Sequence, residues 1–172
     1  MLPDLDIITA PDNKLKQKCA VVVCVDNTIA SIMSSMLEKM YVAPGIGLAA
    51  PQVGILKQII VVDCARGGAP PKPYMMANPT VLWYSDETKS HEEGCLSLPQ
   101  YYEVVSRPDK IRVSYLDENN SSQIIEADGL LSVVIQHEID HLNGILFVDH
   151  ISKVKRSMIL RKLRKTKQKS IR

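Results

Sequence analysis

The 172-residue chain has the length of one ordinary globular domain, and its composition excludes several classes of protein. Apolar residues make up 45% and charged residues 23%, so the chain does not have the composition of a disordered protein. The formal net charge is +2, and no apolar run approaches the roughly 18 residues that a membrane helix needs. We therefore expect one domain that folds in water around its own core.

Cysteine usage indicates the compartment. The four cysteines stand at positions 19, 24, 64 and 95, without CxxC spacing and too sparsely for a disulfide-stapled domain, which favours a reducing environment. The first ten residues carry two aspartates and no lysine or arginine, a pattern atypical of a signal peptide. A cytoplasmic protein of bacterial type is expected, and the mature form of an organellar protein is the alternative.

The first predicted element is an amphipathic helix that begins at Asp26 or Asn27, both plausible caps. Its apolar residues recur at spacings of three and four, and we interpret its methionines as core. Segments rich in β-branched and aromatic residues follow at 58–64, 81–84, 101–106, 111–116 and 123–126. Turn residues separate these segments, so we expect short strands with largely antiparallel pairing.

Two further helices are predicted in the last third of the chain. Residues 130–142 read as a buried helix, with Asp128 as a possible cap and Gly144 just past its end. Residues 145–148 are interpreted as a short strand, and an amphipathic helix then begins near Val154 and includes Leu163. Strands placed between separated helices predict an α+β fold.

The C-terminal segment is strongly basic. Residues 153–172 hold ten lysines and arginines and no acid; subtracting these ten from the net charge of +2 leaves −8 for residues 1–152. Such a segment can be a solvated helix face, or it can contact RNA or the ribosome, because clustered cations attract phosphate without sequence specificity. Charge alone leaves both interpretations open.

The segment His137-Glu138-Ile139-Asp140-His141 is an HExxH motif within the expected buried helix. The two histidines lie one turn apart on the same face, so that both imidazoles can bind one metal ion. A bound divalent metal lowers the pKa of water towards about 7, and Glu138 could pass the released proton to a leaving amine. Burying these groups among apolar neighbours without a metal would be costly. The motif therefore predicts metal-dependent hydrolysis of an amide.

A catalytic metal site of this kind needs a third protein ligand and an open position for water. Residues 153–172 hold no acid, and the only later histidine is His150. The upstream candidate is Cys95, which follows a glycine in the segment 93–99, whereas the other three cysteines are interpreted as ordinary core residues.

Three segments resemble the signature motifs of the peptide deformylase family. They read GIGLAAPQ at 45–52, EGCLSLP at 93–99 and QHEIDHLNG at 136–144, and they occur in the family's order. The resemblance implies a compact α+β fold with antiparallel sheets around a central HExxH helix, flanked by N-terminal and C-terminal helices. Residues 1–152 would form the catalytic domain, and residues 153–172 would be a basic C-terminal helix or tail of the same domain.

The resemblance also implies the activity: removal of the formyl group from the N-terminal formyl-methionine of nascent proteins, with release of formate. Glu138 would be the general acid and base. Gln52 and the backbone N–H of Leu96 would stabilise the oxyanion. The implied metal ligands are Cys95, His137 and His141.

Substrate and metal preferences follow from the same resemblance. Gly45 and Gly47 would let the chain pass close to the substrate backbone, and the methionine pocket would be lined by Ile46, Val133, Val134 and His137. Family members use Fe(2+) natively and accept Zn(2+), Ni(2+) or Co(2+) in its place. The implied partners are N-formylmethionyl peptides, with the ribosome as a further candidate through the basic tail and with no membrane.

We make two further predictions, one for an ion pair and one for an aromatic residue. We expect Asp140 to pair with Arg107 and so to steady the elements that carry the metal ligands. Tyr102 occupies a position where some relatives carry a basic residue that contacts substrate beyond methionine, so aromatic stacking could replace that contact.

Two other functions share part of this pattern. A metallopeptidase would also use HExxH, but it gives no account of Gln52 or of the segment around Cys95. A non-catalytic ribosome-binding protein would use the basic tail and a purely structural metal, which requires a fourth protein ligand that the sequence does not supply.

Overall fold

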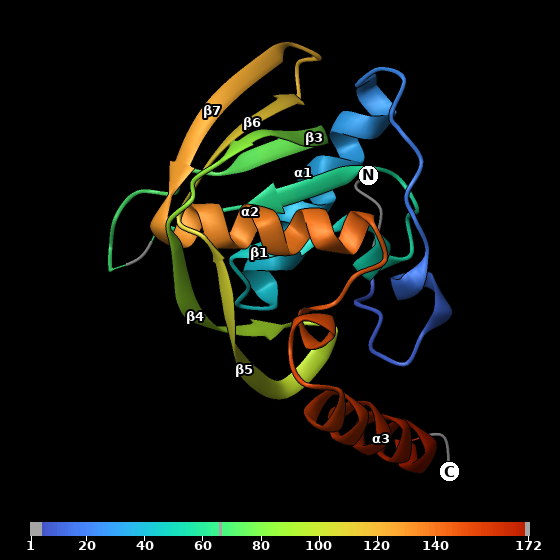
Figure 1. The fold of residues 1–172 in the computed structure, drawn as a ribbon. Helices are drawn as coiled ribbons and strands as arrows, with labels where there is room; N and C mark the ends of the chain where they lie inside the picture. Colours follow the sequence, from blue (N-terminus) through green and yellow to red (C-terminus); the bar gives the residue numbers. More distant parts are fainter. Residues whose placement is uncertain (1–4, 66, 171–172) are drawn as a thin grey trace.

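A computed structural model describes residues 5–65 and 67–170, and it confirms the α+β fold (Figure 1). The helices are α1 (Asn27–Val42), α2 (Gly129–Leu142) and α3 (Lys153–Ser170), with 3-10 turns η1 (Asn13–Lys16), η2 (Ala50–Val53) and η3 (Phe147–His150). The strands are β1 (Gly47–Ala49), β2 (Ile59–Val62), β3 (Tyr74–Tyr84), β4 (Thr88–Cys95), β5 (Leu98–Pro108), β6 (Lys110–Leu116) and β7 (Ser122–Asp128).

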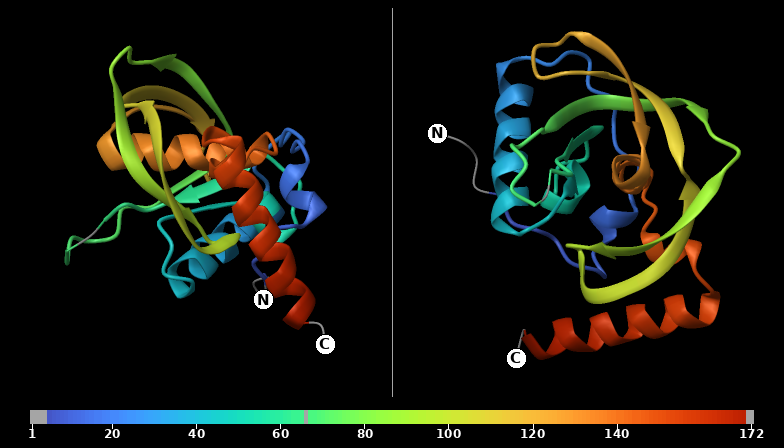
Figure 2. Two further views of the ribbon diagram at one scale, coloured as in Figure 1. Left: turned by 60° about the horizontal axis from the view of Figure 1, so that its bottom comes forward. Right: turned by 90° about the vertical axis from the view of Figure 1, so that its left-hand side faces the viewer.

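The strands form two sheets around α2. One has five strands in the order β1-β2-β3-β6-β7, and the other is the β4–β5 hairpin. Every strand pair in both sheets is antiparallel, as predicted. Seen nearly end-on in the right-hand view of Figure 2, α2 is encircled by these strands, with α1 and α3 outside. The side chains of α2 are therefore held in the interior from several directions.

Local sequence accounts for α1. The Asp26 carboxylate accepts a hydrogen bond from the Ile29 N–H at 2.8 Å, which caps the first turn. Met33, Met36 and Met40 are fully buried in a core cluster shared with β1 and β2, which confirms their interpretation as core residues.

The prediction of a short strand at residues 145–148 is wrong. Leu146 is extended, but Phe147–His150 form the 3-10 turn η3. The Asp149 carboxylate accepts a hydrogen bond from the Leu146 N–H at 2.9 Å, and this contact closes the turn in place of a sheet partner.

The C-terminal helix α3 packs through only part of its predicted apolar face. Ile159 and Leu163 are buried in a cluster with residues of β5 and η3, whereas Val154 and Met158 are 79% and 41% exposed. Among the described residues, no helix is both long and apolar enough to cross a membrane.

The cap of α1 gives a direct test of this fold. Replacing Asp26 by Ala leaves the Ile29 N–H without its acceptor, so we expect a loss of about 1 kcal/mol in the free energy of unfolding, measured in urea. Asp26→Asn keeps a side-chain acceptor at the same place and should lose much less. Equal losses in both variants would contradict the capping role.

Candidate active site

Three side chains with metal-binding atoms converge where α2 meets the end of β4. His137 and His141 lie one turn apart on α2, with ring centroids separated by 5.0 Å. The ladder between β4 and β5 shifts register between Gly94 and Cys95, and the Cys95 Sγ lies 3.2 Å from His141 Nε2. The three ligand atoms all lie within 4.8 Å of one another.

This donor set suits a divalent transition metal. A thiolate and two imidazoles are ligands of soft or borderline ions, and three protein ligands leave a coordination position for water or substrate. Burial alone would lower the pKa of His137, but its contacts with Cys95 and Glu93 raise it well above the usual value. Burial and the neighbouring His137 lower the pKa of His141.

A buried ionic network holds His137 in place. Its Nδ1 lies 2.9 Å from Glu93 Oε2, and the Arg107 guanidinium donates to both Glu93 oxygens, at 2.5 and 3.0 Å. Arg107 also donates to Asp140 Oδ2 at 2.9 Å, so the pairing expected between these two residues is present. His150 Nε2 lies 2.7 Å from the same Asp140 oxygen.

Glu138 lines the same cavity as Cys95 and His137, and it forms no ion pair with any residue that the structure describes. Its Oε2 is buried and has no hydrogen-bond partner within residues 5–65 and 67–170, and burial raises the pKa of the carboxyl to about 7. A Cβ on Gly47 would lie 2.4 Å from Glu138 Oε1, so β1 can pass this close only because residue 47 is glycine. The carboxyl can therefore hold or release a proton near neutral pH.

Gln52 lies in the 3-10 turn η2, and a backbone contact at the start of this turn orients its side chain. Its Oε1 accepts from the Ala49 N–H at 2.8 Å, which leaves the amide nitrogen pointing at the metal-binding cluster. That nitrogen lies 3.4 Å from Cys95 Sγ and donates to Ser97 Oγ at 3.2 Å. A side-chain N–H donor is thus oriented towards the place where a substrate carbonyl could bind.

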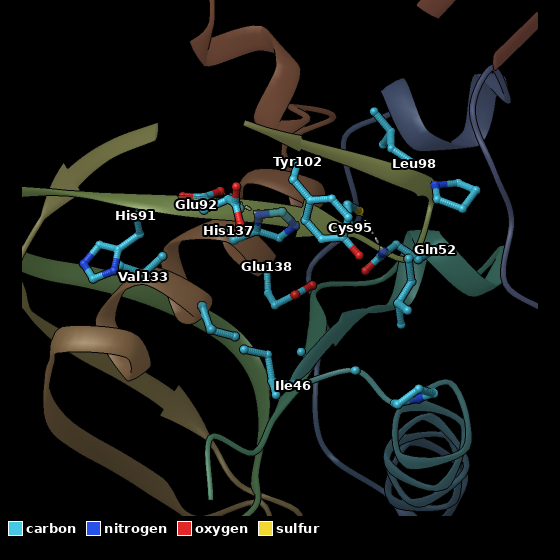
Figure 3. A pocket seen from close by; sticks show the side chains of 18 of the residues that line it. Ile46, Gln52, His91, Glu92, Cys95, Leu98, Tyr102, Val133, His137 and Glu138 are labelled. Atoms are coloured by element: carbon cyan, nitrogen blue, oxygen red, sulfur yellow. Dashed lines mark hydrogen bonds and ion pairs between the residues drawn. The ribbon is translucent and has the colours of Figure 1, made fainter. Parts of the chain in front are cut away.

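These groups open into one cavity of about 660 Å³ (Figure 3). His141 is buried behind it and does not contribute to the lining. The lining includes ten residues that the sequence assigned to catalysis, metal or substrate: Gly45, Ile46, Gly47, Gln52, Cys95, Leu96, Val133, Val134, His137 and Glu138.

Comparison with known proteins identifies the family. The family model for polypeptide deformylase matches residues 4–157. The chain belongs to the polypeptide deformylase family. It is accordingly a metal-dependent hydrolase that removes the N-formyl group from the formyl-methionine of nascent proteins, releasing formate.

Individual peptide deformylases are similar to this chain over almost its whole length. The peptide deformylase of Methylocella silvestris is 50% identical over 95% of this chain and 85% of its own length, and that of Agrobacterium fabrum is 46% identical over 96% and 97%. The crystal structure of peptide deformylase from Ehrlichia chaffeensis superposes with a TM-score of 0.92 at 37% identity, covering 98% of this chain and 99% of its own.

Sequence reasoning missed two parts of this site. The sequence marks Glu93 only as the first residue of a motif, although it is the carboxylate that contacts both His137 and Arg107. Its place two residues before Cys95, on the same strand, was the available signal. Ser97, which accepts from Gln52, and Glu92, which lines the cavity, could be found only from the hairpin register. Tyr102, which the sequence singled out, lines the same cavity.

Removing the Arg107 side chain should reduce stability and metal affinity far more than removing an exposed arginine on the next strand. Arg107→Ala leaves the buried Glu93 carboxylate without its guanidinium partner, so we expect a loss of about 3–5 kcal/mol in the free energy of unfolding. Because His137 also loses its orienting support, metal affinity should fall about 10- to 100-fold, measured as metal content after dialysis against a chelator.

Arg112→Ala is the matched control, because Arg112 forms an exposed ion pair with Glu126. This substitution should lower the free energy of unfolding by no more than about 1 kcal/mol and leave the metal content unchanged. Full metal retention by Arg107→Ala would show that the network does not support the site.

Proposed function

We propose that Cys95, His137 and His141 hold the metal ion of this deformylase and that Glu138 moves the proton in its reaction. The observation that carries the proposal is the convergence of three ligand atoms within 4.8 Å, in a cavity that also contains a buried Glu138 oxygen with no hydrogen-bond partner in the described part of the chain. A closed structural metal site would need a fourth protein ligand, and among the described residues the cluster contains three.

The residues around the cluster account for the steps of formamide hydrolysis. A divalent ion in such a site supplies Lewis acidity, which polarises a carbonyl and lowers the pKa of water. Glu138 takes up a proton at its free Oε2 and delivers it to the departing amine, for which a pKa of about 7 is well matched at neutral pH. The Gln52 amide and the Leu96 N–H donate hydrogen bonds to the formyl oxygen as negative charge develops on it.

The substrate is an N-formylmethionyl peptide whose first side chain enters the cavity. Ile46, Val133 and Val134 supply apolar surface for methionine. Gly47 begins the edge strand β1, and Gly45 lies two residues before it. Binding of short peptides is supported by a relative: the structure from Acinetobacter baumannii, 34% identical with a TM-score of 0.82, is described as bound to Met-Ala-Ser.

We further propose Fe(2+) as the native ion, with Zn(2+), Ni(2+) or Co(2+) as substitutes. A thiolate with two imidazoles accepts all four, so that availability decides which ion is bound. The proposed place of action is the bacterial-type cytoplasm, where nascent chains carry the formyl group. Residues 1–152 are proposed as the catalytic domain, with 153–172 as a basic helix and tail of the same domain, because Ile159 packs into a core cluster of the catalytic part.

Formate release from formyl-Met-Ala-Ser by anaerobically prepared protein tests the proton-transfer role. Glu138→Gln keeps the shape of the side chain but cannot exchange the proton, so kcat should fall by about 10²–10⁴-fold while metal content is retained. Glu118→Gln, the same change at an exposed position, is the control and should be fully active.

The same assay separates this function from its nearest alternative. Unformylated Met-Ala-Ser is included, and a metallopeptidase would cleave it. Cleavage of that peptide, or full formate release by Glu138→Gln, would contradict the proposal.

The ribosome is proposed as a partner of α3. Four exposed cations in the middle of this helix take part in none of the ion pairs found among the described residues: Arg161, Lys162, Arg164 and Lys165. The rest of the chain up to residue 152 carries −8, so the cations of α3 are the main attraction for phosphate.

Replacing these four cations by glutamine should weaken ribosome binding without unfolding α3, because glutamine is a good helix former. We expect the slope of log affinity against log salt to become less steep by about 3 in sedimentation assays. Four exposed lysines elsewhere, Lys14, Lys18, Lys57 and Lys110, provide a control with the same charge change. Equal effects of the two sets would contradict a specific role of α3.

A further inference from the structure

The 3-10 turn η3 lies between α2 and α3 and contacts the metal-binding cluster (Figure 1). At its first residue, the buried Phe147 ring stacks on the His137 imidazole, with ring centroids 6.3 Å apart and an interplanar angle of 21°. At its last residue, His150 Nε2 lies 2.7 Å from Asp140 Oδ2. Phe147 and His150 are not among the residues that line the cavity, so any effect of this turn on the reaction passes through other side chains.

One oxygen of Asp140 receives two donors. Oδ2 accepts from the Arg107 guanidinium at 2.9 Å, and because a carboxylate can only accept, His150 Nε2 is the second donor. The same guanidinium donates through Nε and Nη2 to the two Glu93 oxygens. Glu93 Oε2 in turn lies 2.9 Å from His137 Nδ1. A continuous series of hydrogen bonds therefore runs from His150 to a proposed metal ligand.

The neighbouring residue Asp149 fixes η3 in place. Its Oδ2 accepts from the Leu146 N–H at 2.9 Å and from Lys16 Nζ at 2.5 Å, and its Oδ1 accepts from Arg156 Nε at 2.6 Å. Lys16 belongs to η1 and Arg156 to α3, so this carboxylate joins the turn to two separate segments of the chain. His150 therefore projects from a fixed backbone.

The second donor limits how the Asp140 carboxylate can rotate. With Arg107 alone, the carboxylate could turn while keeping one hydrogen bond, because its side chain is 19% exposed. A donor from η3 on the same oxygen removes this freedom. The guanidinium is planar and rotates as one unit, so fixing the arm that contacts Asp140 also fixes the arms that hold Glu93. The outer partners of a metal-binding imidazole set its ring orientation and its basicity.

We propose that His150 is a positioning residue for the metal ligand His137, acting through Asp140, Arg107 and Glu93. The proposal rests on the proposed function, because it takes His137 as a ligand of the ion. Loss of the His150 donor loosens the His137 imidazole and weakens its bond to the metal, although no group that contacts the substrate is removed.

The test compares His150→Ala with His150→Gln, whose amide nitrogen can still donate to Asp140. Release of Co(2+) to a chelator should be about three- to tenfold faster in His150→Ala, a smaller effect than that of Arg107→Ala, because His150 is two hydrogen bonds further from the ligand. The visible absorption of the Co(2+) protein should shift, since these bands report the ligand geometry. For formyl-Met-Ala-Ser, kcat should fall by a similar factor with KM unchanged. His150→Gln should recover all three properties.

Lys155→Met is the matched control. Lys155 lies five residues after His150 and forms an ion pair with Glu103 at 2.7 Å, so the change breaks a contact at the start of α3 that does not involve Asp140. It should leave Co(2+) release and absorption as in the wild type.

Wild-type Co(2+) release and absorption in His150→Ala would overturn the proposal. Equal effects in His150→Ala and Lys155→Met, or no recovery in His150→Gln, would also overturn it, because the effect would then belong to local packing. A wild-type protein that binds no divalent ion would overturn the proposed function itself, so the two failures are distinguishable.

Discussion

The ion pair between Arg107 and Glu93 is the contact on which the rest of the site depends. Their side chains are only 6% and 4% exposed, and a charge so deeply buried is tolerated only when its partners satisfy it. The planar guanidinium reaches Glu93 on β4 and Asp140 on α2 at once. It thereby joins the hairpin that carries Cys95 to the helix that carries both histidines.

The same network explains why two glutamates in one site behave differently. Burial alone would raise the pKa of Glu93, but hydrogen bonds from His137 and Arg107 lower it to about 2. Glu138 is as deeply buried, but no described residue donates a hydrogen bond to its Oε2, and burial raises its pKa to about 7. One carboxylate stays ionised as a support and the other can exchange protons, although the residue type is the same.

The elements with strong local signals were predictable, and those defined by tertiary pairing were not. The capped, periodic helix at Asn27–Val42 was found from sequence, as was the HExxH helix. The strand β1 was missed because Gly-Leu-Ala has little β propensity, and β4 because its sequence TKSHEEGC is polar and charged. The motifs contain the three ligand residues together with Glu138, Gln52 and Leu96, but the contacts of Glu93 depend on a hairpin register that only the folded chain fixes.

The separation of charge described for α3 has a physical consequence for the whole molecule. A net charge of +2 suggests weak long-range electrostatics, yet it is the sum of −8 and +10 on different parts of the chain. Such a molecule has a large electric dipole, so a polyanion exerts a torque on it before contact is made. When the protein approaches a phosphate-rich surface, α3 faces that surface and the acidic part of the chain faces away from it. The orientation of the molecule, and not only its attraction, then governs how often an encounter is productive.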